Sequence, residues 1–256
     1  MRVLHVWEVS STTISTFMDR IYGTRSAVLC REKYDPYGHN TTTPNLQGSV
    51  FEFYGDAVLW ASRADIVHIH SRDRLAPMVK RLKKPVVMHY HGSDIRGKWQ
   101  ERRKRWEKAD ALMVSTPDLL EGAPENAVYL PNPVNTDLFH PDAVEHARDS
   151  AVHFSKGADD LATEIARENE LPLIIVKQRI MRRDMPPLLR NYTHLVDVKR
   201  SSDGEVLRAR SLLALEALAC GLQVLSPDGV VKGLPEEHRP ENVVKTLYEL
   251  YTGLMG

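Results

Sequence analysis

The sequence predicts an α/β protein of two domains, each built on a parallel sheet covered by helices. The chain has 256 residues, and two domains of about 100 to 150 residues each would be ordinary at this length. Short runs rich in Val, Ile and Leu alternate with longer helical stretches, which is typical of βα units. Several of these runs are apolar throughout, as in strands covered on both faces.

The first half of the chain contains most of the expected elements. Apolar runs predict strands at residues 3–9, 27–31, 66–70, 86–90, 111–115 and 128–130. The stretches between them predict helices at residues 14–21, 51–62, 74–82, 97–108 and 117–120.

The second half repeats this pattern on a smaller scale. Strands are expected at residues 152–154, 173–176, 194–198 and 222–225. Helices are expected at residues 158–169, 185–190, 210–220 and 241–252. The segment "PNPVNTDLFHPDAVEHARDS" separates the halves, and its three prolines cannot continue a helix or a central strand. We therefore predict domains at 1–131 and 151–238, a linker at 132–150 and a C-terminal helix at 239–256.

Composition excludes some classes of function. The 34 basic residues balance 34 acidic ones, so we expect no nucleic-acid partner. No apolar run approaches the roughly 18 residues of a membrane span. The apolar stretch at the amino terminus is too short for a signal peptide, so we expect a cytoplasmic protein. Cys30 and Cys220 lie in apolar contexts and are expected to be reduced, buried thiols.

Ligands of parallel sheets bind at the carboxyl ends of the strands. After the first expected strand, "SSTTIST" predicts a hydroxyl-rich loop that runs into a helix. Ser11, Thr12 and Thr13 could contact a sugar or an acceptor there, since hydroxyls and free N–H groups at a helix start bind phosphate and sugar oxygens. The alternative is ordinary capping and turn chemistry.

The loop "HYHGSDIRGK" follows the expected strand 86–90. It gathers His91, Ser93, Asp94 and Arg96, which we interpret as contacts to a sugar or an acceptor. His91 is the best candidate because imidazole can donate to or accept from a hydroxyl near neutral pH, with Asp94 beside it. We expect His89 to point to the opposite side from His91 and to be structural.

A zinc site is the alternative for these histidines. No Cys pair and no second His pair at metal-ligand spacing accompanies them, so we expect no metal. His68 and His70 in "DIVHIHSRD" are expected to be hydrogen-bonded structural histidines at a strand end.

Several segments together resemble a known family. They are "ADIVHIHS", "KPVVMHYHGSD", "ADALMVST", "VYLPNPVNTDLFHP", "SKGADDLATEIA" and "LLALEALACGLQVLS". In order and spacing, from about residue 64 to 228, they resemble the GT-B nucleotide-sugar glycosyltransferases of the retaining group-one type, of which the chain looks like a short and divergent member. The resemblance implies two Rossmann-like domains whose parallel sheets face each other across a cleft. It also implies a hexosyltransferase that moves a sugar from a nucleotide diphosphate donor to an acceptor hydroxyl with retention, without a metal or another cofactor.

The resemblance also implies roles for individual residues. His91 matches a histidine that contacts the transferred sugar, and Lys156, followed by Gly157 in "SKG", matches the lysine that neutralises the donor diphosphate. Glu216 matches the glutamate that binds the ribose hydroxyls. It is a lone carboxylate in a helix that is apolar nearly all round, so it needs a partner. Ser211 is expected to cap this helix, whose N–H groups would face the diphosphate.

The sequence also departs from the family. Arg208 stands where the family has a glutamate, and no arginine precedes Lys156 by a few residues. We expect Arg208 or Arg210 to pair with the donor phosphates instead. These differences keep open a catalytically silent GT-B subunit that binds a nucleotide sugar and supports a partner enzyme. A sugar-nucleotide epimerase of the same fold is a further, less favoured alternative.

The segment "GKWQERRKRWEKAD" predicts a basic amphipathic helix at 97–108. Trp99 and Trp106 are seven residues apart and would share one face of it. We favour an ordinary helix with its tryptophans in the core. The alternative is peripheral contact with the inner face of a membrane or with a lipid-phosphate acceptor.

Overall fold

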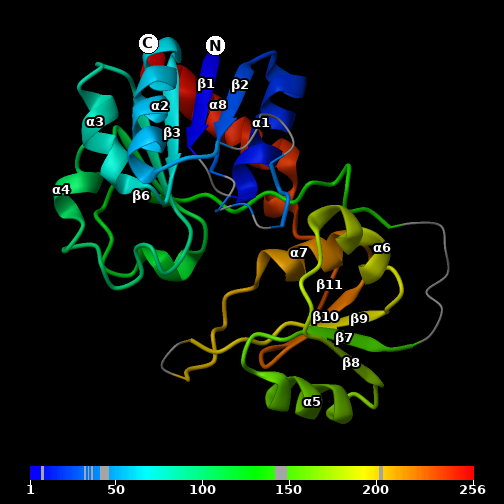
Figure 1. The fold of residues 1–256 in the computed structure, drawn as a ribbon. Coiled ribbons are helices and arrows are strands. Elements are labelled where there is room, and N and C mark those ends of the chain that lie inside the picture. Colours follow the sequence, from blue (N-terminus) through cyan, green and yellow to red (C-terminus); the bar gives the residue numbers. More distant parts are fainter. Residues whose placement is uncertain are drawn as a thin grey trace. The chain divides into compact units, whose positions relative to one another are not determined.

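The computed structural model describes residues 1–6, 9–31, 33, 35, 37–40, 46–141, 149–201 and 204–256. They form two compact units, each with its own sheet (Figure 1). Unit 1 comprises Met1–Pro133 and Pro240–Gly256, and unit 2 comprises Val134–Arg239. Among the described residues, no helix combines the length and the apolar character that crossing a membrane would need.

Unit 1 contains a six-stranded parallel sheet in the order β2-β1-β3-β4-β5-β6. Its strands are β1 (Arg2–Val6), β2 (Arg25–Leu29), β3 (Ile66–His70), β4 (Val86–Tyr90), β5 (Ala111–Val114) and β6 (Ala127–Tyr129). The strand order reverses between β1 and β3, because β2 lies on the other side of β1. The carboxyl ends of β1 and β3 therefore flank the place where such sheets bind ligands.

Helices cover both faces of this sheet (Figure 1). They are α1 (Val9–Tyr22), α2 (Val50–Arg63), α3 (Ala76–Lys80), α4 (Arg103–Trp106) and α8 (Pro240–Met255), with 3₁₀ turns at Asp73–Leu75 and Pro117–Leu120. Leu4 and Val67 pack toward α2 and α3, whereas their neighbours Val3 and Ile66 pack toward α1 and α8. Because side chains alternate along a strand, two covered faces require the continuous apolar runs seen in the sequence.

Unit 2 contains a five-stranded sheet in the order β11-β10-β9-β7-β8. Its strands are β7 (Ala151–Phe154), β8 (Leu173–Val176), β9 (His194–Val196), β10 (Gln223–Ser226) and β11 (Gly229–Lys232). Its helices are α5 (Asp159–Glu168), α6 (Met185–Leu189) and α7 (Leu212–Ala219), with 3₁₀ turns at Arg182–Asp184 and Glu236–His238. Among the described strands of unit 2, β11 alone is antiparallel. It pairs with β10, and sequence reasoning missed it. The strand order reverses between β7 and β9.

The α/β class and the two sheets are confirmed, and three expected elements differ. The strand expected at 3–9 ends at Val6, and α1 already begins at Val9; residues 7 and 8 lie outside the described part. Packing of the apolar face of α1 overrides the weak helix propensity of its Ser and Thr residues. The stretch 97–108 forms turns and the single helical turn α4.

The expected linker also contains core residues. Val134 and Phe139 are fully buried in the cluster of unit 2, whereas residues 142–148 of the expected linker lie outside the described part. The C-terminal helix α8 belongs to unit 1, where it packs against α1. Cys30 and Cys220 are buried free thiols, as expected.

Candidate functional site

Glu216 lies within α7, with 4% of its surface exposed. Residues 214–219 of this helix are all buried, which confirms the expected burial. Burial raises the pKa of Glu216, and the positive charges of Arg182 and Lys156 offset part of that rise. The helix thus holds a carboxylate in the interior of unit 2, where it depends on nearby cations.

The cation in contact with Glu216 is Arg182, which sequence reasoning missed. Nη1 of Arg182 donates to Oε1 of Glu216, and 10% of the Arg182 side chain is exposed. The guanidinium also lies over the ring of Phe139, 4.8 Å from its centroid. Arg182 follows β8, at the carboxyl edge of the sheet. This position after a predicted strand is the one feature of the sequence that could have marked Arg182 as a site residue. A pair that spans 34 residues leaves no local sequence pattern.

Lys156 and Gly157 form an exposed bend directly after β7. Gly157 has a φ of 76°, in the left-handed region that favours glycine. Its carbonyl oxygen accepts a hydrogen bond from Nη1 of Arg200 at 3.2 Å. Lys156 is close enough to Glu216 to act on its pKa. The structure therefore brings the expected lysine and glutamate together in unit 2.

Ser211 caps α7, as expected. Its Oγ accepts from the N–H of Ala214 at 3.1 Å and donates to Oδ1 of Asp197 at 2.7 Å. The N–H of Ser211 donates to the same carboxylate at 3.0 Å. Asp197 follows β9, so this network ties the start of α7 to the strand end beside the reversal point of the sheet.

Arg208 does not contact Glu216. Its side chain is 82% exposed, and Nη1 lies 3.3 Å from Oδ1 of Asp228. Arg210 is also exposed. Arg182, from another loop, is the arginine that contacts Glu216, and pairing of Arg208 or Arg210 with the donor phosphates stays a prediction.

In unit 1, Asp94 holds the loop after β4. Its carboxylate accepts from the N–H of Gly92 at 2.6 Å and from the N–H of His91 at 3.0 Å. Ser93 is exposed, and its carbonyl oxygen accepts from Nζ of Lys98 at 2.7 Å. Asp94 thus has a role in loop structure that sequence reasoning did not assign.

His91 is half-buried at the carboxyl end of β4. Its Nδ1 lies 3.1 Å from Oδ1 of Asn132, and its Nε2 lies 3.0 Å from Nδ1 of His70. Both ring nitrogens are therefore engaged within unit 1. A ligand that bound this imidazole would have to replace one of these partners.

His91 is one member of a histidine cluster that spans three strands. The other members are His5, His68, His70 and His89, each 0% exposed. The expectation that His89 points away from His91 is wrong: their ring centroids are 4.2 Å apart, because residues two apart in an extended chain share a face. His68 and His70 are hydrogen-bonded, as expected, to Tyr251 and His91.

Ser11, Thr12 and Thr13 lie inside α1 rather than in a loop. Their exposed fractions are 0%, 5% and 3%, so they are core residues of the structure rather than open contacts. Oγ of Ser15 donates to the carbonyl oxygen of Thr12 at 2.9 Å, the back-bonding that Ser and Thr make inside helices.

Arg96 lines a cavity of about 420 Å³ beside the loop after β4. Its Nε donates to Oδ2 of Asp118 at 3.1 Å. Gln100, Glu121 and Trp99 also line the cavity. The walls therefore offer several groups that can bond to hydroxyls.

The basic segment 97–108 is used mainly for internal contacts. Trp99 is 3% exposed and donates from Nε1 to the carbonyl oxygen of Leu119, and Nε1 of Trp106 donates to the carbonyl oxygen of Trp99. Arg102 and Arg105 both pair with the buried carboxylate of Asp73, at 3.0 and 3.3 Å. The core interpretation agrees with these contacts, and no observation favours a membrane surface.

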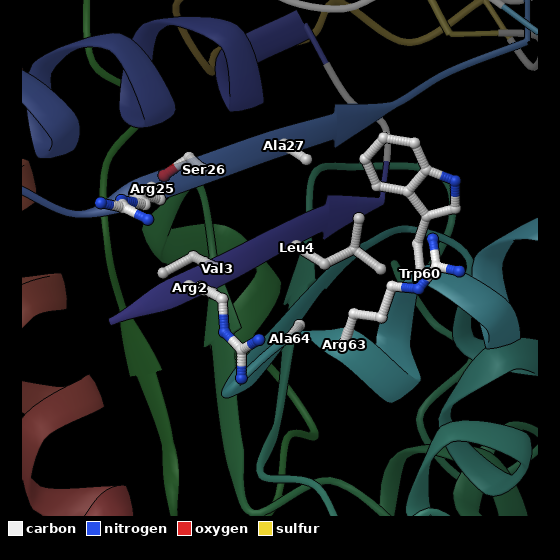
Figure 2. A pocket seen from close by; sticks show the side chains of 9 residues that line it. All are labelled: Arg2, Val3, Leu4, Arg25, Ser26, Ala27, Trp60, Arg63 and Ala64. Carbon is white, nitrogen blue, oxygen red and sulfur yellow. The ribbon is translucent and has the colours of Figure 1, made fainter.

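A second cavity of unit 1, of about 260 Å³, lies at the other end of the sheet (Figure 2). Arg2 and Arg25, the first residues of β1 and β2, line it with Arg63 and Trp60 of α2. It lies at the amino ends of these strands, away from the edge where parallel sheets bind ligands. We therefore do not assign the donor to it.

A search with protein-family models found no match, and neither did a search of curated proteins. Solved structures share the fold. AviGT4, a glycosyltransferase involved in avilamycin A biosynthesis, is 12% identical with a TM-score of 0.66, covering 100% of this chain and 98% of AviGT4. An α-glucosyltransferase in complex with UDP and a DNA 13-mer containing an HMU base is 11% identical, with a TM-score of 0.61. The match covers 100% of this chain and 92% of that enzyme. S. aureus MnaA with UDP is 11% identical with a TM-score of 0.54, covering 99% and 90%. The chain therefore has the GT-B fold.

Proposed function

We propose that this protein is a glycosyltransferase that transfers a sugar from a nucleotide diphosphate to an acceptor hydroxyl, with retention of configuration. The observation that carries the proposal is the convergence of Lys156, Arg182 and Glu216 at the carboxyl edge of the unit 2 sheet. Two cations and one buried carboxylate match the two parts of a donor, its diphosphate and its ribose diol. The fold it shares with two glycosyltransferases of known structure supports the same function.

Glu216 suits the ribose. A carboxylate accepts hydrogen bonds at both oxygens, and one of them is held by Arg182. A vicinal diol can donate to the same group. The positive charge of Arg182 opposes the rise in the pKa of Glu216 that burial causes, which favours the ionised carboxylate that a diol would need.

Lys156 and Arg182 suit the diphosphate. When the acceptor oxygen bonds to the anomeric carbon, the bond from that carbon to the donor phosphate oxygen breaks. The leaving diphosphate gains negative charge, which fixed cations stabilise more in the transition state than in the bound donor. The proton of the acceptor hydroxyl passes to the departing phosphate oxygen. We assign to Arg182 the part that the sequence suggested for Arg208.

The acceptor belongs to unit 1 in this proposal. The cavity beside Arg96 has polar walls that can bond to the hydroxyls of an acceptor, and His91 is the proposed contact to the transferred sugar. For His91 to contact a sugar, it must exchange its bond to His70 or Asn132. Neither cofactor nor metal takes part in the proposed transfer.

The first test is nucleotide binding. UDP, GDP and ADP are titrated into the full chain and followed by thermal shift and calorimetry, with UDP first because two structural neighbours hold it. Binding by one of the three supports the donor site, since a ligand that binds only the folded state raises Tm. If none of the three stabilises the protein, the donor assignment is overturned.

Glu216→Ala should abolish this binding, whereas Glu164→Ala, at an exposed position of α5, should leave it intact. Unchanged affinity in Glu216→Ala would refute the ribose role. The protein is then incubated with the sugar conjugate of the nucleotide that binds, and the release of free sugar is measured. Slow release indicates an active transferase. Binding without any release favours the silent subunit.

A further inference from the structure

Five histidines of unit 1 lie on one face of its sheet. His5 is the register partner of His68 between β1 and β3, and His70 is the register partner of His89 between β3 and β4. His91 follows two residues after His89. Earlier on each strand, the same face carries an apolar core residue. These residues are Val3 on β1, Ile66 on β3 and Val87 on β4. The polar side chains therefore gather at the carboxyl edge, next to the reversal point of the sheet.

The cluster contains more polar atoms than hydrogen bonds. Among the buried side-chain atoms of the described residues, Nε2 of His5, Nε2 of His68 and both ring nitrogens of His89 have no well-formed hydrogen bond. The carbonyl of Leu130 lies close enough to offset slightly the fall in the pKa of His89 that burial causes. An unpartnered buried polar group normally costs stability, so such atoms on three histidines of one cluster need a reason.

Three of the histidines have the arrangement of metal ligands. His70, His89 and His91 each offer one ring nitrogen, and the three atoms lie within 4.8 Å of one another. Nδ1 of His70 is 3.0 Å from Nε2 of His91. Nitrogens bound to zinc at about 2.0–2.1 Å in a tetrahedron lie roughly 3.3 Å apart. The His70–His91 pair nearly has this spacing, and the offered nitrogen of His89 lies within 4.8 Å of both.

In His70 and His91, the second ring nitrogen, which would not bind the metal, has a partner that would orient the ring. We call it the outer nitrogen. Nδ1 of His91 faces Oδ1 of Asn132 at 3.1 Å, and Nε2 of His70 faces Nδ1 of His5 at 3.4 Å. If each outer nitrogen carries the proton, the lone pairs of His70 Nδ1 and His91 Nε2 face each other. Two lone pairs 3.0 Å apart repel unless a proton or a cation lies between them. Metal-binding histidines are commonly held in this way by a partner on the second nitrogen.

We propose that His70, His89 and His91 form a binding site for a divalent transition-metal ion of the zinc, cobalt or nickel class. Neutral imidazoles select these ions over magnesium and calcium, which prefer oxygen ligands. His91 is half-buried and gives the ion a path from solvent and a coordination position open to water. The proposal is independent of the donor residues of unit 2, but it is an alternative to the proposed contact of His91 with the transferred sugar, because the metal would take Nε2 of His91 while Asn132 holds Nδ1.

The experiment uses the full chain, stripped of metal with a chelator and dialysed. Co²⁺ is titrated and followed by its visible d–d absorption, and Zn²⁺ is titrated by calorimetry. We expect one equivalent of each to bind. His89→Gln should weaken binding by at least about 100-fold, beyond what loss of a supporting partner causes. The visible bands should disappear with it.

The matched control is His68→Gln. His68 is equally buried on the same face, and with His5 and His70 it belongs to the other trio of nitrogens within 4.8 Å. Unchanged affinity in His68→Gln supports the proposed trio. No uptake by the unmodified chain, or an equal loss in both variants, overturns it.

A second variant guards against misfolding. Far-UV circular dichroism first compares the fold of the variants. If His89→Gln fails to fold, His89→Cys keeps a ligand of smaller size, and Co²⁺ bound to it should show a new thiolate charge-transfer band. Absence of that band in a folded His89→Cys, with Co²⁺ in excess, also overturns the proposal.

Discussion

Arg182 and Glu216 form an ion pair inside unit 2, with 10% and 5% of their side chains exposed. The two residues come from different βα segments, and neither has another charged residue of opposite sign in contact among the described residues. A pair of this kind is costly to break from one side, because the remaining charge is left in a poorly solvated place.

Arg182→Met should therefore lower the free energy of unfolding by about 3–5 kcal/mol. The double variant Arg182→Met with Glu216→Leu should regain most of that loss, since it leaves no buried charge. Urea unfolding of the single and double variants measures both values. A single variant that loses less than about 1 kcal/mol, the range of surface pairs, would contradict the buried geometry.

Arg182 and Arg208 should differ in donor binding. Arg182→Lys keeps the charge but loses the planar fork that bonds to carboxylate and phosphate, so UDP affinity should fall about tenfold. Arg208→Gln should leave the Kd for UDP unchanged, because Arg208 is exposed and pairs with Asp228. Calorimetric titration of UDP into the two variants measures and compares their Kd values. The reverse ranking would restore the role that the sequence suggested for Arg208.

Lys156 should act on the diphosphate rather than on the nucleoside. Lys156→Gln is expected to weaken UDP binding by about 10- to 150-fold and uridine binding hardly at all, because a lost charge-assisted bond costs roughly 1.5–3 kcal/mol. Lys177→Gln is the control, at a lysine that is 75% exposed in the same unit. Equal weakening of UDP and uridine by Lys156→Gln would point to a folding defect instead.

Ser211 should stabilise α7 through its cap. Ser211→Ala removes the bond to the N–H of Ala214 and the donor to Asp197, and should cost about 1 kcal/mol, with up to 2 for a cap in a buried network. Ser211→Thr keeps the hydroxyl and should restore most of the stability. Thermal unfolding compares the three proteins. An alanine variant as stable as the unmodified protein would mean that Asp197 alone holds the helix start.

Stability should fall as the pH drops below about 6.5. Burial lowers the pKa of His5 to about 4 and lowers the pKa values of His68, His70 and His89 well below the usual value. These groups stay neutral in the folded chain while they gain protons in the unfolded chain below about pH 6.5.

The unfolded state then binds more protons, so the free energy of unfolding decreases as the pH falls, and these histidines add no slope above about pH 7. Each fully neutral histidine contributes up to about 1.4 kcal/mol per pH unit. Urea unfolding from pH 7.5 to 5, with chelator present, measures the slope. His68→Phe should reduce it by about one proton, whereas His140→Phe, at an exposed position, should not. Equal slopes in both variants would contradict the buried, neutral state of His68.

The sequence by itself determined most of the strands and their class. The runs 66–70, 86–90 and 173–176 match β3, β4 and β8 to the residue, because short runs rich in Val and Ile favour strands. Burial of Glu216 could also be predicted, since a helix that is apolar all round has no face for solvent. The cap at Ser211 followed from local hydrogen-bond chemistry.

Only the tertiary structure decided the partners. Arg182 meets Glu216 across 34 residues, and His70 meets His91 across 21, and such contacts depend on which strands are neighbours in the sheet. The same reason explains the Ser/Thr segment, which packing drew into α1. Sequence periodicity indicates which face of a helix or strand is buried. Which residue packs against that face depends on the order of the strands in the sheet.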